Sequence, residues 1–429
     1  MLPADYKPYT GCEKPKIVTL DVTGQQPLKK GEVTHLALEG GGGKGLAYLG
    51  AVRALEEIGV LSNLQGFAGS SAGAITAMLL SSGMRASDVK AWMDATDFGG
   101  FFDPAEPREH ILHGYPQSQY DNAMGSAVDT TWWERAFAAW LDGYALPLVA
   151  RVLGDSGTQL ADLISGKGKP PMSVLGPNLG KFLSQMWNDF GLFSGVKPMR
   201  TFDTLLRNLV RGYANDMPSM PPVTFDEHFQ KFNRKLVVTG SNLSTGKTVY
   251  FSADTTPAMA VCVAVRISMG LPFIFKPVRI KSDQHDYDGY YVDGGVWNNT
   301  PYAPFDEGQA RPTTFVLRLG IDVNEEAPEP KTLVDFLGRY FQLTFAGSGE
   351  TQFGFSRAFQ ARELPVQGLN LIDFTPPPIG RDRAIRCAYE ATMDYFGETP
   401  KQPNWPSDGY DMLPNSVPSD LDLSQVTRP

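Results

Sequence analysis

Two short apolar segments, each followed by a glycine-containing turn and then by a helix pattern, constrain this fold most. Residues 34–39 predict a strand that leads into a run of glycines. Leu or Val then recurs every three residues up to Ile58, which predicts a helix that Gly59 ends. Residues 64–68 predict a second strand, and the Ala-, Leu- and Met-rich residues 71–80 predict a second helix. Strands and helices that alternate in this way build a parallel sheet covered by helices.

The loop after the first strand reads Gly40-Gly41-Gly42-Gly43-Lys44-Gly45. It does not match a Walker A phosphate loop, because Lys44 is followed by glycine rather than serine or threonine. It does satisfy the Gly-x-Gly-x-x-Gly pattern of dinucleotide-binding proteins, but the next strand does not end in the acidic residue that binds a ribose. Glycines also let backbone N–H groups approach a developing oxyanion, and this interpretation fits the loop best.

The second turn reads Gly69-Ser70-Ser71-Ala72-Gly73 and matches the Gly-x-Ser-x-Gly pattern of a nucleophile elbow. It follows a predicted strand and opens a predicted helix, as such an elbow does. The spacing selects Ser71 as the nucleophile, and Gly69 and Gly73 permit the tight turn and close helix packing. The alternative is a turn of small residues in which Ser71 only caps the helix.

A serine nucleophile needs a base. None of the five histidines, His35, His110, His113, His228 and His285, lies in a recognisable strand-end loop. The better candidate is Asp293, which follows the apolar pair Tyr291-Val292 and precedes Gly294 and Gly295. An aspartate at a strand end beside two glycines can approach a serine closely. The alternative for this segment is a hairpin turn.

Together these three segments resemble the patatin-like phospholipase family. The resemblance covers about residues 33–97 and 234–305 and includes the block 266–272 ahead of the aspartate. It assigns an oxyanion loop, an elbow and a base motif, namely Gly40-Gly41-Gly42-Gly43-Lys44-Gly45, Gly69-Ser70-Ser71-Ala72-Gly73, and Asp293-Gly294-Gly295 with Asn298, Asn299 and Pro301 behind it.

The resemblance implies an α/β protein with a three-layer α/β/α fold and a mostly parallel central sheet. It also implies a Ser71–Asp293 dyad that hydrolyses lipid acyl esters through an acyl-enzyme, with no metal or other cofactor. We therefore expect a phospholipase A or lysophospholipase that releases fatty acid from glycerophospholipids. The alternatives are a neutral-lipid or general carboxylesterase on the same dyad, a lipid-binding module without activity, and a dinucleotide-binding protein.

Further along the chain, residues 234–240, 248–252, 273–280 and 314–319 predict strands. Pro257 suits the first turn of a helix that runs to about Met269. An amphipathic helix is predicted for residues 382–396.

We predict three regions: an N-terminal arm of residues 1–30, a catalytic domain of residues 31–345, and a C-terminal helical extension of residues 346–429 with a poorly ordered, proline-rich tail. Within the catalytic domain, residues 98–232 break the α/β rhythm and are rich in aromatic residues, which predicts a large insertion or cap. We expect part of it, around Trp132 and Trp133, to line or cover the acyl site; extra helical packing on the sheet is the alternative.

The net charge of −9 disfavours nucleic-acid binding and gives little long-range attraction to anionic lipid. The three cysteines, Cys12, Cys262 and Cys387, predict neither a disulfide framework nor a zinc site, which suits a reducing compartment.

Residues 1–16 lack the apolar core of a secretory signal peptide, and the most apolar stretch, residues 258–265, is too short to span a bilayer. We expect a soluble protein, cytoplasmic or exported without such a signal. Its expected partner is a phospholipid or membrane surface, at which it acts peripherally; an activating protein partner is not identified by the sequence.

Overall fold

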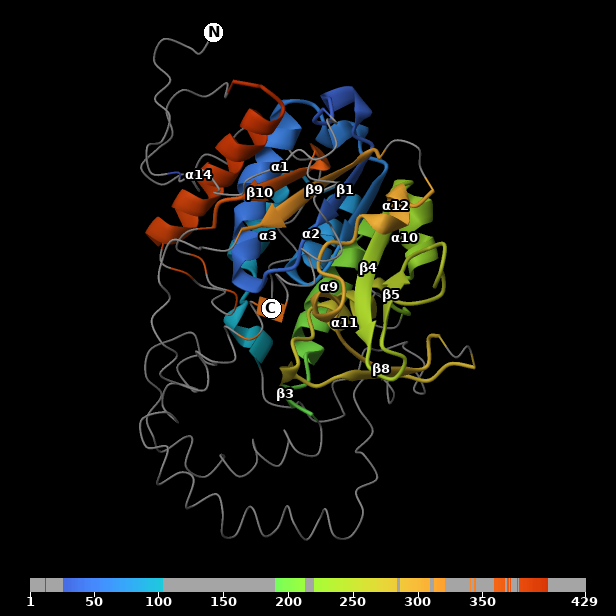
Figure 1. The fold of residues 1–429 in the computed structure, drawn as a ribbon. Helices are drawn as coiled ribbons and strands as arrows, with labels where there is room; N and C mark the ends of the chain where they lie inside the picture. The colour runs from blue at the N-terminus through green and yellow to red at the C-terminus, as the bar shows by residue number, and fades with distance from the viewer. Residues whose placement is uncertain are drawn as a thin grey trace, which may run out of the picture.

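The computed structural model describes residues 26–102, 190–212, 220–283, 286–308, 312–320, 359–366 and 378–399, with single positions at 12, 340, 343, 344, 369, 371 and 376 (Figure 1). Trp132 and Trp133, most of the predicted insertion and the proline-rich tail lie outside these residues.

The centre of the molecule is an eight-stranded sheet in the order β10-β9-β1-β2-β4-β8-β7, with β5 paired to β4 as well. The pairs from β10 to β4 are all parallel, whereas β5 and β8 run antiparallel to β4, and β7 antiparallel to β8. The predicted mostly parallel sheet is therefore confirmed. The strands are β1 (His35–Leu38), β2 (Gly66–Gly69), β4 (Lys235–Asn242), β5 (Lys247–Phe251), β7 (Val278–Ile280), β8 (Gly289–Asp293), β9 (Thr314–Leu319) and β10 (Ala361–Leu364).

Successive strand residues point to opposite faces of this sheet, and each face has its own core. Leu36 and Leu38 face the larger core, which is covered by helices α1 (Tyr48–Glu57), α2 (Ala72–Ser81), α11 (Val261–Ser268) and α14 (Pro378–Tyr395). Ala37 faces the smaller core, where Phe305 of α12 (Ala303–Asp306) packs. Helices therefore cover both faces, which gives the three-layer α/β/α arrangement.

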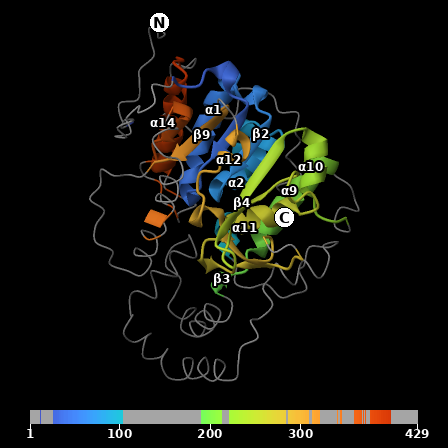
Figure 2. The same ribbon diagram turned by 45° about the vertical axis from the view of Figure 1, so that its right-hand side comes forward.

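The remaining described helices extend the larger layer. In Figures 1 and 2, α14 lies beside α1 towards one end of the sheet and α10 (Phe225–Phe232) towards the other. Helix α3 (Ala86–Ala95) packs on α1, and α9 (Val196–Arg211) packs on α11. Strands β3 (Gly191–Phe193) and β6 (Phe273–Phe275) form a separate two-stranded sheet. Short 3-10 helices complete the set: η1 (Lys30–Glu32), η2 (Gly42–Ala47), η3 (Leu61–Asn63), η4 (Gly99–Phe102) and η8 (Gly294–Val296).

Two sequence-based predictions differ from the structure. The strand predicted over 273–280 is divided into β6 and β7, which belong to different sheets, because Pro277 has no N–H to donate to a continuous ladder. The helix predicted from Pro257 begins only at Val261. The carbonyl groups of Pro257 and Met259 instead accept hydrogen bonds from the start of α10.

One prediction about the cysteines is wrong. Cys12 and Cys387 form a disulfide bond that ties the N-terminal segment to α14, while Cys262 is a buried thiol. The two cysteines are 375 residues apart, so their spacing in the sequence gave no sign of the pairing. Because disulfide bonds persist in oxidising compartments, the cysteines no longer support a reducing one.

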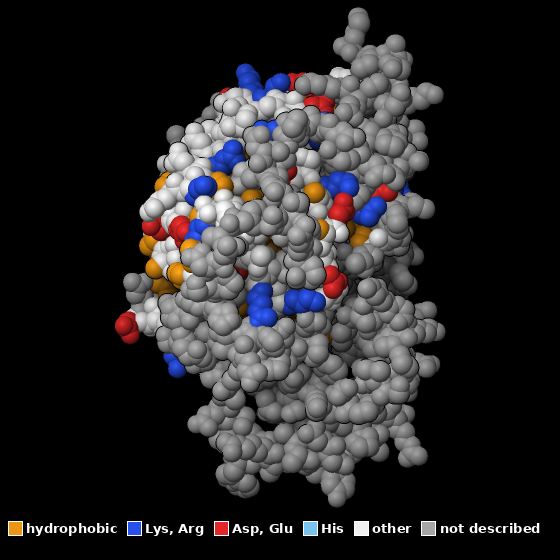
Figure 3. All heavy atoms as spheres, turned by 180° about the vertical axis from the view of Figure 1, so that it is seen from behind, with side chains coloured by type: hydrophobic (Ala, Val, Ile, Leu, Met, Phe, Trp, Pro, Cys, Tyr) orange, Lys and Arg blue, Asp and Glu red, His pale blue; other side chains and the backbone are white. Residues whose placement is uncertain are grey.

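Helices long and apolar enough to cross a bilayer are absent from the part of the chain that the structure describes. On the face seen in Figure 3, the described Lys and Arg side chains are interspersed with acidic and hydrophobic ones. Long-range attraction of this described surface to a polyanion is therefore not expected.

Candidate active site

The serine turn adopts the strained backbone of a nucleophile elbow. Ser71 lies between β2 and α2 with φ of 52° and ψ of −123°, a region that non-glycine residues rarely occupy. Its backbone N–H donates to the hydroxyl of Ser268 at 3.0 Å. Gly69 and Gly73 allow the turn to close, because a Cβ on Gly69 would lie 2.2 Å from the carbonyl oxygen of Gly73.

The sheet brings Asp293 to the same place through β4. On one edge of β4, β2 pairs up to Gly69, which lies opposite Val238. Strands β5 and β8 both pair with residues 240–242 of β4, so they occupy opposite edges of β4. Strand β5 also pairs with Val238, whose other edge is taken by β2, so β5 lies on the edge of β4 away from β2. Strand β8 consequently pairs with the same edge of β4 as β2 does, just beyond the point where the pairing with β2 ends. Because it runs antiparallel, its last residue, Asp293, arrives opposite Gly240, two residues beyond the partner of Gly69.

Asp293 is completely buried, with its Oδ1 accepting the backbone N–H of Gly295 at 2.8 Å. Its Oδ2 has no hydrogen-bond partner of ordinary geometry among the described residues. Burial raises the pKa of Asp293 to about 7, while the Gly295 N–H and the nearby Ser71 side chain act in the opposite direction. A carboxyl group with this pKa can accept a proton near neutral pH.

The glycines after Asp293 permit its close packing. A Cβ on Gly294 would lie 2.0 Å from the hydroxyl oxygen of Thr239 on β4. Gly295 supplies the N–H that holds Oδ1 of Asp293. Both glycines therefore support the position of the carboxyl group.

The predicted glycine loop runs past this pair, and its ends are anchored. Gly40 donates its N–H to Asn299 and accepts the Asn299 side-chain amide through its carbonyl oxygen at 3.0 Å. Gly43 donates to the carbonyl oxygen of Leu371 at 2.9 Å. The N–H groups of Gly40 and Gly43 are thus used to hold the loop.

The middle of the loop is different. Among the described residues, the N–H groups of Gly41 and Gly42 have no hydrogen-bond acceptor. Gly42 has φ of +53°, and a Cβ there would lie 1.8 Å from the carbonyl oxygen of Leu371. The loop reaches the serine, because a Cβ on Gly40 would lie 2.9 Å from Cβ of Ser71. Gly41 and Gly42 are thus the loop residues with N–H groups available to a ligand.

Lys44 and Gly45 support the loop through contacts with the end of β9 and the start of α2. The Lys44 ammonium donates to the carbonyl oxygen of Gly320 at 3.2 Å, and a Cβ on Gly45 would lie 2.8 Å from that of Ala72. Lys44 is thus bound to backbone at the end of β9, and Gly45 lets the loop approach the start of α2.

Sequence reasoning missed two supporting residues. Glu39, at the end of β1, accepts the backbone N–H of Leu319 at 2.6 Å and the Thr300 hydroxyl at 3.1 Å, and its burial raises its pKa. Ser268 holds the elbow from α11. A charged residue directly ahead of a glycine run was a signal for Glu39. Ser268 lies in the block 266–272 that the resemblance included, but nothing local assigned it a role.

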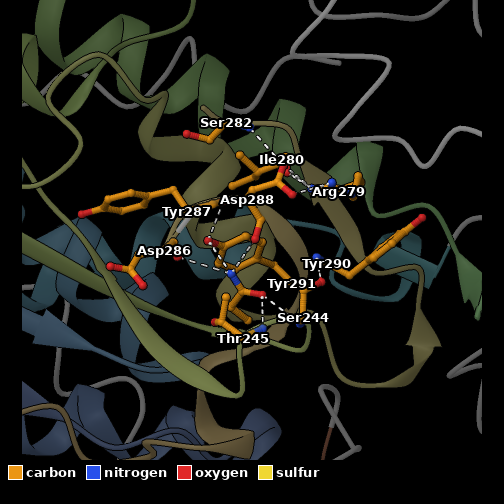
Figure 4. Close-up of polar contacts among 11 residues, drawn as sticks. Ser244, Thr245, Arg279, Ile280, Ser282, Asp286, Tyr287, Asp288, Tyr290 and Tyr291 are labelled. Carbon is orange, nitrogen blue, oxygen red and sulfur yellow. Dashed lines mark hydrogen bonds and ion pairs between the residues drawn. The ribbon is translucent and has the colours of Figure 1, made fainter. Parts of the chain in front are cut away.

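A polar network holds the hairpin that carries Asp293 (Figure 4). Arg279 of β7 pairs with the Asp288 carboxylate at 2.8 Å. The side-chain amide of Asn242 donates to the carbonyl oxygen of Asp288 at 3.1 Å and to the Tyr291 hydroxyl at 3.2 Å. This network anchors β8 to β4 and to β7.

The structure places the described histidines away from Ser71. His35 begins β1, at the opposite end of the strand from the glycine loop, and stacks on Phe305. His228 contacts Ser82, beyond the far end of α2, and burial lowers its pKa to about 4. His110, His113 and His285 lie outside the described residues.

An apolar pocket opens beside Ser71. Its walls come from the glycine loop, α1, α2, α3 and the segment 269–275, and they include Leu49, Leu79, Trp92, Met269 and Leu271. Groups of three or more His, Cys, Asp or Glu side chains that could hold a metal ion do not occur within the described ranges.

The family model for patatin-like phospholipases matches residues 36–306 of this chain. The chain belongs to this family. It is 32% identical over 130 residues to "Probable lipid hydrolase 463L" of Invertebrate iridescent virus 6, a match that covers 30% of this chain and 40% of that protein. It is 29% identical over 122 residues to "Uncharacterized protein R571" of Acanthamoeba polyphaga mimivirus, covering 28% and 35%. The matches thus span less than half of either relative.

Among solved structures, the chain is similar to VipD from Legionella pneumophila, with a TM-score of 0.45 and 19% identity over 85% of this chain and 67% of VipD. It is also similar to the type III effector protein ExoU, with a TM-score of 0.35 and 17% identity over 85% of this chain and 53% of ExoU.

Proposed function

We propose that this protein is a serine phospholipase of the A or lysophospholipase type, in which Ser71 is the nucleophile and Asp293 the base. One observation carries the proposal. A serine in a strained elbow and a buried carboxyl group with a pKa of about 7 meet at the ends of two strands that share one edge of β4. Perturbed pairs of this kind mark catalytic sites.

Each step follows from these groups. Asp293 takes the hydroxyl proton of Ser71 as Oγ attacks the ester carbonyl carbon. The N–H groups of Gly41 and Gly42 stabilise the oxyanion. Asp293 returns the proton to the departing lysolipid oxygen as the ester bond breaks, which leaves an acyl-enzyme. It then takes a proton from water, which attacks the acyl carbon, and returns it to Ser71 as the fatty acid leaves.

The pocket supports a lipid substrate, because a wall of apolar side chains beside the nucleophile suits an acyl chain and not a nucleotide. The lipid would come from a membrane or micelle surface, where the protein acts peripherally, either in the cytoplasm or after export. A neutral-lipid or general carboxylesterase on the same dyad would use the same groups, and product analysis separates these activities.

A fluorophosphonate probe tests the nucleophile directly. We expect it to label the wild-type protein at Ser71, as located by peptide mass analysis, and phosphatidylcholine vesicles to yield fatty acid and lysolipid. Ser70→Ala is the matched control because Ser70 is the neighbouring buried serine; it should retain labelling. Labelling at a serine other than Ser71, or release of a head group rather than fatty acid, would contradict the proposal.

The pH profile tests the base. Asp293 must be ionised to act, and its pKa is raised to about 7. We therefore expect kcat/KM on a soluble ester to fall about tenfold per pH unit below roughly pH 7 and to level off above it. Measurements in buffers of constant ionic strength between pH 5 and 9 check this. A rate that is flat down to pH 5 would contradict a base with this pKa.

A further inference from the structure

The pocket beside Ser71 runs along α2. Ser71, Ile75 and Leu79 all line it, and their spacing of four residues places them on one face of the helix. A helix rises 1.5 Å per residue, so Ile75 lies about 6 Å and Leu79 about 12 Å beyond Ser71. The pocket is therefore an elongated channel, with the nucleophile towards one end.

Helices α1 and α3 form the other walls of this channel. Helix α1 begins at the glycine loop, follows β1 as α2 follows β2, and contributes Leu49 and Val52. Helix α3, which packs on α1, adds Val89 and Trp92. The lining is apolar even at Thr76, because the Thr76 hydroxyl donates to the backbone carbonyl oxygen of Ala72 at 3.1 Å. The walls therefore offer apolar contacts rather than hydrogen bonds.

Exposure shows which end of the channel is closed. On α2, Leu79 is the last residue that lines the channel, and it is only 2% exposed. By contrast, Ala72 and Ile75, nearer Ser71 on the same helix, are only partly buried. The channel is thus open along its near part and blind at the far end of α2.

We infer that this channel holds the acyl chain of the substrate end-on along α2, and that its blind end at Leu79 sets the chain length up to which binding improves. The inference rests on the proposed function, because the acyl carbonyl must lie at Ser71. A fully extended chain advances about 1.2 Å per bond, since a residue of three backbone bonds spans roughly 3.3–3.6 Å. The distance to Leu79 therefore accommodates about ten carbons.

This geometry predicts a break in chain-length dependence. Each CH₂ group moved from water into the channel contributes about 0.8 kcal/mol, equivalent to a factor of up to about four in kcat/KM. For p-nitrophenyl esters of four to sixteen carbons in mixed micelles of fixed surface concentration, kcat/KM should rise to about ten carbons and then level off. Longer chains place their extra carbons at the open side, where no further apolar surface is buried.

Larger side chains along α2 should shift the break to a chain length set by their distance from Ser71. Ile75→Phe should move the break to about five or six carbons, because Ile75 is one turn from Ser71. Leu79→Phe should move it to about eight carbons. Leu80→Phe is the matched control: Leu80 is equally buried in α2 but does not line the channel, so the break should stay in place.

Leu79→Ala provides a second variant in case the larger side chains prevent folding, because it enlarges the far end of the channel and should shift the break to longer chains. A break that is unchanged in Ile75→Phe, Leu79→Phe and Leu79→Ala would overturn the inference. So would shifts in Ile75→Phe and Leu79→Phe of equal size or in the reverse order.

A binding readout separates this inference from the proposed chemistry. In Ser71→Ala, fatty acids should raise the Tm increasingly with chain length up to the same break. If the wild type hydrolyses no ester while fatty acids show that break, the channel is supported and the proposed function fails. If esters are hydrolysed with no break in either assay, the function stands and the channel inference fails.

Discussion

Replacing Ser71 by alanine, or Asp293 by asparagine, should each lower the rate of ester hydrolysis by at least about 10³-fold. Ser71→Ala removes the attacking oxygen. Asp293→Asn keeps the shape and the contact with Gly295 but cannot accept a proton. Because the two side chains act as one unit, the double variant should be no slower than the slower single variant. Initial rates on a soluble ester, with burst-phase kinetics for the acyl-enzyme, provide the measurement.

Thermal unfolding serves as the control for Asp293→Asn. The folded-state pKa of Asp293 is raised to about 7, above its ordinary value of 3.8, so its contribution to stability is present below about pH 4 and is lost as pH rises through 7. Relative to wild type, Asp293→Asn should gain Tm between pH 5 and pH 8, by an amount equivalent to a few kcal/mol. Near-wild-type turnover by this variant would show that Asp293 is not the base. An unchanged Tm difference across that pH range would show that its pKa is not raised.

Gly42→Ala should lower kcat by a factor on the order of 10² to 10³. Its Cβ would lie 1.8 Å from the carbonyl oxygen of Leu371, in a backbone conformation with φ of +53°. The loop must shift to relieve this contact, and the N–H groups of Gly41 and Gly42 then move away from the oxyanion. Single-turnover rates with a soluble ester isolate the chemical step.

Gly83→Ala is the matched control for this variant. Gly83 also has a positive φ, of +86°, but a Cβ there meets nothing within 4 Å. It should lose stability of about 1 kcal/mol without losing activity, because only the backbone strain is shared. If Gly42→Ala were as active as Gly83→Ala, the loop would not form the oxyanion site; loss of nucleotide binding in that active variant would favour the dinucleotide interpretation instead.

The glycine loop and the serine elbow could be predicted because their signals are local. A loop of glycines between a strand and a helix, and a serine flanked by Gly69 and Gly73, need only a few neighbouring residues to define their conformation. The same local reasoning predicted β1, β2, α1 and α2 to within a few residues. It did not show which N–H groups of the loop hold the loop in place and which are available to a ligand. The hydrogen bonds of Gly40 and Gly43 go to Asn299 and Leu371, which are more than 250 residues away.

The pocket shows a second limit of local reasoning. The sequence directed attention to the aromatic residues 98–232, and Trp132 and Trp133 lie outside the described residues. Within the described ranges, Phe98 and Phe101 from the start of that region contribute to the pocket, but half of the lining residues come from α1, α2 and α3. Periodicity identified the face of α1 as buried without showing that a channel lies beside it, because burial in a core and burial around a cavity produce the same apolar pattern.

By itself the sequence determined the α/β alternation, the elbow serine and the glycine loop, because these follow from backbone preferences within short segments. Tertiary structure decided which aspartate lies near the serine. Strand β8 reaches Ser71 because it runs antiparallel to β4 and pairs with the same edge of β4 as β2, beyond the end of β2. It also set the pKa of that aspartate, through complete burial, and joined Cys12 to Cys387. These properties depend on strand pairing and burial between residues far apart in the chain, which no local pattern records.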